Sequence, residues 1–284
     1  VNLKLKTSAA CRIYFIANAG DLESFITGES VLKTYTKDFA VSADGLPSGS
    51  LGMTGVWSGA VTDAGITGSV DLVRQAAKII FKYTISNANG FSFTPTAVTL
   101  NNVPAKSQLI EPDAQLSSVS YGTYTGTVDN TTATVYWYLP ENKAGIVSDA
   151  NAVTSEKEKV GTGVSDATYI EMTGTAVQNG VTYNDVSVKL YPGGDAAHTT
   201  GTYNNYNVSR NCAYNMTITL TGIDFADKRV TVGSIPEITN PDNLDAAKGA
   251  TKEVQITARP GVEWSFMLPS WLSAVIGGTS AGAG

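Results

Sequence analysis

Few residues in the chain could perform acid–base or nucleophilic chemistry. The one histidine, His198, lies in the segment GGDAAHTTG, whose glycines and small polar residues predict a loop. A Ser-His-Asp site would have to use this histidine, and GVSDA at 163–167 matches only half of the G-x-S-x-G motif. We favour a solvated loop histidine over a catalytic one.

Carboxylates are the next candidates, because two of them about 5–10 Å apart can hydrolyse a glycosidic bond. The acidic residues in or beside predicted loops and strands are Glu141, Glu156, Glu158 and Glu171. Nothing in the sequence indicates that two of these carboxylates lie together, so glycoside hydrolysis would require the fold to bring a pair within that distance. Trp264 and Trp271 could form a sugar-stacking surface, although a role in a core is favoured for a Trp pair in a β unit.

Metal and cofactor sites are not indicated by the spacing of ligand residues. Asp242 and Asp245 lack the D-x-[DN]-x-[DN]-G ladder of a calcium loop. Cys11 and Cys212 fit no metal-binding spacing, and we favour two separate thiols over a disulfide between them. GTGVSD at 161–166 lacks the third glycine of a dinucleotide-binding turn, and no P-loop is present. The sequence predicts no cofactor, no metal and no enzyme.

The composition indicates many short strands joined by turns. Only 15% of the 284 residues are charged, 42% are apolar and 28 are glycine, and Thr, Val, Tyr and Asn recur throughout. The net charge of −6 argues against nucleic acid and anionic membrane surfaces as partners. No apolar run approaches the roughly 20 residues that span a bilayer, and the opening residues VNLKLKTSA predict a strand rather than a signal peptide. Cys11 follows Ser8-Ala9-Ala10 as in a lipoprotein cleavage box, but without the preceding apolar segment.

Alternating apolar positions predict strands along most of the chain, with one or two short helices within 21–39. VDLVRQAAKIIFKYTI at 70–85 fits a helix or a strand, and its β-formers from Ile79 onward favour a strand, with a bulge near 74–77. Pro95 predicts an edge or a bulge, and a register slip is expected near Asp185. Further strands are expected at 11–17, 91–103, 132–140, 167–177, 181–193 and 215–222.

Breaks in periodicity divide the chain into three expected units. The segment VPAKSQLIEPDAQ, from 103, holds two prolines, and GSIPEITNPDN, near 230, is rich in turn residues. We therefore expect an N-terminal β-sandwich over 1–112, a second β-sandwich over 113–230 and a partial β module over 231–284. The third unit, of about 50 residues, is short for a complete sandwich.

Six segments occur in an order that resembles the fimbrillin family of Bacteroidetes bacteria, the type V pilins and their relatives. The last two are the most specific, although the Asp-Phe that usually precedes Asn-Val in the family is replaced here. The segments are IYFIANAGD (13–21), LVRQAAKI (72–79), VTLNNVPAKSQL (98–109), YWYLPENKAG (136–145), ATYIEMTG (167–174) and YNNYNVSRNCAYNMTITLTG (203–222).

The resemblance implies an all-β protein with two tandem transthyretin-like β-sandwiches. It further implies export as a lipoprotein and polymerisation by strand exchange, in which a strand of one subunit completes the sheet of the next. In polymerising members a protease cuts after an arginine and removes the first strand. Arg12 lies early in the chain, but the sequence before it is shorter than in the family, and no cleavage site is assigned.

The final motif is expected to have a structural role. By the resemblance, Arg210 and Asn211 organise the loop that enters a late strand, and Tyr214 begins the buried face of that strand. Arg offers five donors to loop carbonyls, and Asn closes turns with its own backbone. ITARPGVEWSFMLPSWLSAV at 256–275 resembles the start of an immunoglobulin-like module of Bacteroidetes carbohydrate-binding-associated proteins.

Together these features lead to one functional expectation and one alternative. The first is a non-catalytic fimbrial (pilus) subunit or fimbrillin-like surface adhesin, located in the outer membrane or an extracellular fimbrium. Its partners would be other pilin subunits and a host or bacterial surface glycan or protein, with a lipid anchor in the precursor. The alternative is a surface carbohydrate-binding lipoprotein that does not assemble into filaments.

Overall fold

Strands account for most of the regular structure, which confirms the all-β prediction. The computed structural model describes residues 4–39, 41–148, 153–161, 164–194, 203–234, 274–276 and 279–281. In this part of the chain the helices are α1 (Glu29–Thr34), within the segment where short helices were expected, and the 3₁₀ turn η2 (Glu156–Glu158).

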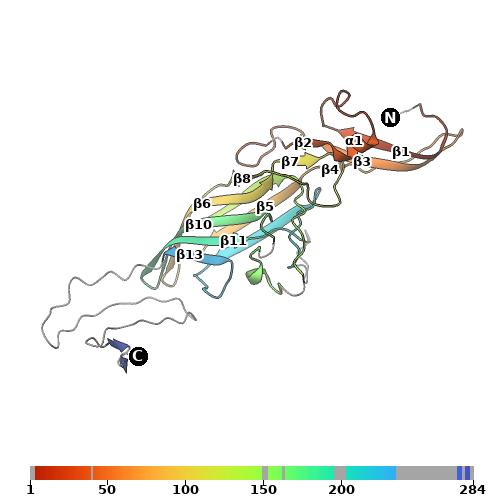
Figure 1. The fold of residues 1–284 in the computed structure, drawn as a ribbon. Coiled ribbons are helices and arrows are strands. Elements are labelled where there is room, and N and C mark those ends of the chain that lie inside the picture. Colours follow the sequence, from red (N-terminus) through yellow and green to blue (C-terminus); the bar gives the residue numbers. More distant parts are fainter. Residues whose placement is uncertain are drawn as a thin grey trace. The chain divides into compact units, whose positions relative to one another are not determined.

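Two sheets face each other in residues 1–234, which form one unit, as Figure 1 shows. The larger has the order β13-β11-β10-β6-β8 and the smaller the order β12-β5-β9. The larger sheet comprises β13 (Val230–Ser234), β11 (Val181–Leu190), β10 (Tyr169–Gln178), β6 (Phe91–Pro104) and β8 (Tyr121–Thr125). The smaller comprises β12 (Ala213–Leu220), β5 (Ala77–Ile85) and β9 (Thr132–Leu139).

A separate sheet precedes this sandwich in the sequence, and we call it the first sheet. It has the order β1-β3-β4. Its strands are β1 (Ser8–Ala17), β3 (Met53–Val61) and β4 (Val73–Arg74). Beside it, β2 (Thr36–Asp38) pairs with β7 (Lys106–Gln108). In the second unit, residues 235–284, β14 (Ala274–Ile276) pairs antiparallel with β15 (Thr279–Ala281). The immunoglobulin-like module expected at 256–275 lies almost wholly outside the described residues.

Alternation along the strands builds the core between the two facing sheets. On β5, Ala77, Ile79, Phe81, Tyr83 and Ile85 are all buried, and the residues between them point outward. Trp137 of β9 is fully buried and stacks on Phe81 with ring centroids 6.3 Å apart. The same core receives Leu100, Ile170 and Met172 from the larger sheet. One hydrophobic core therefore holds the two sheets together.

The irregularities expected from sequence lie where the strands depart from ideal pairing. The β10–β6 register shifts where Thr173 pairs with Ala97 and Gly174 with Pro95, which is the bulge predicted at that proline. Asp185 has φ +51 and lies at the shift between β10 and β11, confirming the predicted slip. Residues 73–85 form β4 and β5, separated at Gln75 and Ala76, and the strand expected from Ile79 onward is confirmed.

The sheet pairing crosses the boundary that the sequence placed at residue 112, and this corrects the expected division into 1–112 and 113–230. Strand β5 pairs with β9 and β12, and β6 pairs with β8 and β10. The physical reason is that buried strands find partners by the match of their apolar faces, whatever their distance in sequence. Pro104 and Pro112 lie on either side of β7, inside one unit.

Adjacent residues of β9 give a matched test of this core. We expect Trp137→Ala to lower the free energy of unfolding by about 3–5 kcal/mol, because a fully buried ring and its Nε1–H bond to the Thr125 carbonyl (3.0 Å) are lost. Tyr136→Ala, at an exposed ring, should cost under about 1 kcal/mol. Urea denaturation followed by circular dichroism measures both. Equal effects would contradict the assigned faces of β9.

Candidate functional site

Two of the segments that carry the family resemblance, 136–145 and 203–222, contact each other. The segment 203–212 runs along 142–147, with bridges between Asn142 and Val208 and between Ile146 and Asn205. The Asn207 side-chain oxygen accepts a hydrogen bond from the Gly145 amide at 2.7 Å. The asparagines in the polar approach to β12 therefore close turns and bind backbone groups of the opposite segment.

Arg210 lies at the centre of this arrangement and is only 3% exposed. Its Nε donates to Glu141 at 3.1 Å, and its Nη2 donates to the second oxygen of the same carboxylate. Nη1 donates to the Leu109 carbonyl at 3.2 Å and Nη2 to the Gln108 carbonyl at 2.8 Å. The prediction that this arginine satisfies loop carbonyls is confirmed. Its bidentate salt bridge with Glu141 neutralises a guanidinium charge that would otherwise be buried without a partner.

Asn211 and Tyr214 complete the entry into β12. Asn211 has φ +58, and its amide donates to the Ala76 carbonyl at 2.8 Å, just before β5 begins. Tyr214 is fully buried, and its hydroxyl accepts a hydrogen bond from the Ser209 amide at 2.8 Å. These contacts set the parallel register of β12 on β5, and the expected roles of both residues are confirmed.

The fully buried Leu109 carbonyl collects donors from three parts of the chain. Besides Arg210, it accepts from the Gln75 side-chain amide at 3.0 Å and from the Thr54 hydroxyl of β3 at 3.1 Å. Thr54 belongs to the first sheet, whereas Arg210 leads into the sandwich. This carbonyl therefore ties the first sheet to the sandwich through buried hydrogen bonds. We call the set Thr54, Gln75, Leu109, Glu141 and Arg210 the Leu109 junction.

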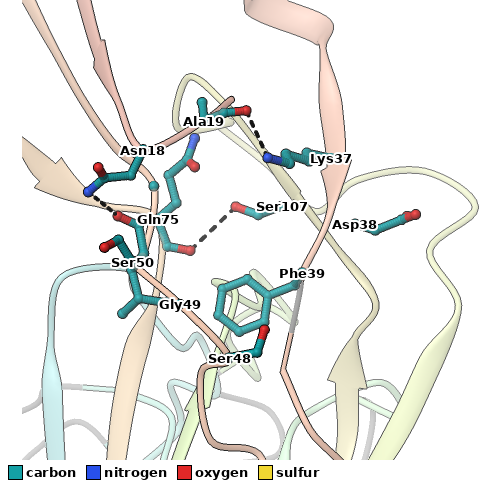
Figure 2. Close-up of a pocket in the computed structure, with 12 residues that line it drawn as sticks. Asn18, Ala19, Lys37, Asp38, Phe39, Ser48, Gly49, Ser50, Gln75 and Ser107 are labelled. Atoms are coloured by element: carbon teal, nitrogen blue, oxygen red, sulfur yellow. Dashed lines mark hydrogen bonds between the residues drawn. The ribbon is translucent and has the colours of Figure 1, made fainter. Parts of the chain in front are cut away.

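A cavity of about 120 Å³ adjoins this junction, between the turn after β1 and the β2–β7 pair (Figure 2). Its polar groups bind one another: Asn18 donates to the Leu51 carbonyl at 3.1 Å and Lys37 to the Ala19 carbonyl at 2.8 Å. Ser107 donates to the Gln75 carbonyl at 3.5 Å (Figure 2). These bonds brace the loops around the cavity, and we assign it a structural role.

The carboxylates considered for catalysis have structural partners instead. Glu141 pairs with Arg210; Glu171 accepts from the Ser187 hydroxyl at 2.7 Å; and Glu158 accepts from the Thr154 hydroxyl at 2.7 Å. Glu156 lies on η2. Within the described ranges, no cluster of three His, Cys, Asp or Glu residues could hold a metal ion. His198, Asp242, Asp245, Trp264 and Trp271 lie outside the described residues.

The first sheet has two edge strands, β1 and the two-residue β4. In the part of the chain that the structure describes, the ten-residue β1 pairs with β3 alone. Arg12, Tyr14 and Lys33 converge on Glu29 of α1 and lower the pKa of its carboxyl to about 2, chiefly through the Lys33 hydrogen bond. Arg12 thus lies inside a strand that α1 anchors. Cys11 of β1 and Cys212 are not joined by a disulfide.

A buried lysine, which sequence reasoning missed, contacts the 203–212 segment at Tyr206. Lys159 is 2% exposed and donates to the Gly193 carbonyl at 2.5 Å. Its ammonium lies 5.1 Å from the centroid of the Tyr206 ring. Burial lowers the pKa of Lys159 to about 8, because the charged form loses its hydration. No motif surrounds this lysine, so only the tertiary structure reveals its burial.

Comparisons with known proteins give likenesses to fimbrial and adhesion proteins. The family described as a domain of unknown function, DUF4906, matches residues 137–218. The chain is similar to the tip fimbrial protein Mfa3 from Porphyromonas gingivalis with a C-terminal truncation (17% identity, TM-score 0.47, 78% of each chain covered). No curated protein sequence matches the chain.

Two further solved structures are similar to the chain. One is a provisionally described cell adhesion protein from Bacteroides eggerthii (17% identity, TM-score 0.46, covering 78% of this chain and 75% of that one). The other is a fimbrial assembly protein from Parabacteroides distasonis (15% identity, TM-score 0.36, covering 78% and 72%). In the described part of the chain, no helix is long and apolar enough to span a membrane.

The Leu109 junction can be tested with a double-mutant cycle. Arg210→Met should lower the free energy of unfolding by about 3–5 kcal/mol, because the Glu141 carboxylate is left buried without its partner. Arg210→Met with Glu141→Leu should recover part of this loss. Asp224→Asn, at the exposed pair with Lys157, is the control and should cost under about 1 kcal/mol. A double variant as unstable as Arg210→Met would show that the lost carbonyl bonds, rather than the charge, dominate.

Lys159 predicts a pH dependence of stability. The pKa of this lysine is lower in the folded chain than its ordinary 10.5, so the unfolded chain binds more protons between pH 8 and 10. The contribution of Lys159 to the free energy of unfolding should therefore rise by about 2 kcal/mol from pH 8 to pH 10. Lys159→Met should lack this rise in denaturant titrations. A parallel pH profile for both proteins would contradict the lowered pKa.

Proposed function

We propose that this chain is a non-catalytic fimbrial subunit or fimbrillin-like cell-surface adhesin that associates with other subunits by β-strand exchange. The observation that carries the proposal is the pair of motif segments 136–145 and 203–222, which the resemblance marks as fimbrillin-like and which build one structural element through Arg210 and Glu141. Export as a lipoprotein and a place in the outer membrane or an extracellular fimbrium belong to the same proposal.

The edge strand β1 supports strand exchange on physical grounds. A long edge strand presents backbone donors and acceptors that another strand can pair with. One face of β1 carries Cys11, Ile13 and Phe15, all only partly buried, so an added strand would cover apolar surface as well as extend the sheet. The first sheet has three strands, one of them only two residues long, and would gain most from an additional strand.

The location of the protein on cells tests the proposal. Immunogold electron microscopy of the source cells, with antibody against residues 1–230, should label regular filaments along their length or at their ends. Label along the length indicates a stalk subunit, and label at the ends indicates a tip or an anchor. Diffuse surface label without filaments would favour the alternative, a surface carbohydrate-binding lipoprotein that does not assemble.

Assembly through the β1 edge can be tested by proline substitution at its bulge. The β1–β3 register shifts between Ser8 and Cys11, which leaves Ala9 and Ala10 without partner residues on β3. Ala10→Pro should therefore change the melting temperature by less than about 4 °C, while a proline in an edge strand hinders pairing with an incoming strand. We expect fewer filaments on cells with Ala10→Pro than with the control Ala10→Ser. Unchanged filaments would exclude this edge as the assembly site.

A further inference from the structure

The outward face of the smaller sheet combines tyrosine, lysine, hydroxyl and amide side chains. On β5 and β9 the outward residues include Lys78, Ile80, Lys82, Tyr136 and Tyr138, which are exposed or half-buried while their neighbours in sequence are buried. We call these five residues the tyrosine–lysine face. The polar side chains that surround it are Thr84, Thr132, Thr134, Asn215, Thr217 and Thr219.

The strand register fixes how these side chains lie across the sheet. Lys78 pairs with Tyr138, and Ile80 lies between Tyr136 on one side and Asn215 on the other. The Lys78 ammonium is 4.9 Å from the ring centroid of Tyr136 and 5.6 Å from that of Tyr138. The two rings hold the ammonium in place through cation–π attraction and leave its charge without a neutralising carboxylate.

The face is basic in a chain that is acidic. The chain has 25 Asp and Glu residues against 19 Lys and Arg, yet β5, β9 and β12 contain no Asp or Glu. Two exposed lysines elsewhere have carboxylates nearby: Lys106 lies 3.9 Å from Asp38, and Lys157 lies 2.6 Å from Asp224. Among the described residues, no ion pair of this kind involves Lys78 or Lys82. Their charges are thus available to an anionic partner.

The spacing of the two lysines favours an extended partner over a small ion. Lys78 and Lys82 are four residues apart on one strand, which places their backbones about 13 Å apart. At that backbone separation, successive acidic groups along an extended partner match the two lysines better than a single phosphate or carboxylate does. The hydroxyl and amide groups between and beside them would pair with a ligand rich in hydroxyls. Tyr136, which is 45% exposed, offers an apolar ring surface against which a sugar ring can pack.

We propose that the tyrosine–lysine face binds an acidic polysaccharide, a chain of sugar rings that carries carboxylate or sulfate groups. Lys78 and Lys82 pair with successive acidic groups, Tyr136 contacts a sugar ring between them, and Asn215 and Thr217 bind sugar hydroxyls. The inference takes from the proposed function only that the protein lies at the cell surface. Binding requires neither filaments nor strand exchange, so its failure would leave the assembly proposal intact.

Binding of the purified full chain to immobilised polysaccharides tests this inference. Biolayer interferometry would compare hyaluronan, which carries carboxylates, and chondroitin sulfate with neutral dextran and with poly-glutamate. We expect binding to one or both acidic polysaccharides that weakens as salt is raised, and none to dextran. No binding to either acidic polysaccharide would overturn the proposal, as would equal binding to poly-glutamate, which would mark a general site for acidic chains.

Matched variants assign the binding to the face. Lys78→Gln with Lys82→Gln should weaken binding by about tenfold or more, the equivalent of one lost charged contact. Lys106→Gln with Lys157→Gln removes the same net charge elsewhere and should bind like the wild type. Tyr136→Ala should weaken binding severalfold, and Tyr136→Phe, which keeps the ring, should not. Thermal melting confirms that each variant folds. Equal losses in the two lysine pairs would overturn the proposal.

Discussion

The buried bond between Arg210 and Glu141 is the interaction on which the rest of the structure depends. A guanidinium and a carboxylate with almost no exposed surface persist because each satisfies the other and the remaining donors reach the Gln108 and Leu109 carbonyls. Thr54 and Gln75 bind the same Leu109 carbonyl, so the first sheet, the β5 entry and the β12 entry meet at one buried point. Loss of the pair would loosen three parts of the chain together.

This junction also explains the unusual parallel pairing within the sandwich. Strand β12 returns beside β5 only after the 203–212 segment has crossed the 142–147 segment, and Asn211 then fixes its start against Ala76. With both of its neighbours in place, β5 becomes the centre of a three-stranded sheet whose inner face is wholly apolar. The outer face is left to water and carries the tyrosine–lysine face. Core packing and a candidate binding surface are thus two sides of the same strands.

The sandwich and the first sheet differ in how completely their apolar side chains are buried. The sandwich has a continuous core from both of its sheets, whereas most side chains of β1 remain partly exposed. Under the proposed function, the edge strand and half-covered apolar face of the first sheet would receive a neighbouring strand, and the packed sandwich would keep its shape.

The sequence by itself determined the all-β class, most strand positions, the bulge at Pro95 and the register shift at Asp185, because period-two patterns, proline and turn residues act locally. The roles of Arg210, Asn211 and Tyr214 followed from the resemblance that the final motif carries. The sequence did not determine that Glu141 partners Arg210, that Lys159 is buried, or that β5 and β6 join strands far beyond residue 112. Those facts depend on which apolar faces meet and which buried charges find partners. Such long-range choices have no signature in local spacing, so only the tertiary structure decided them.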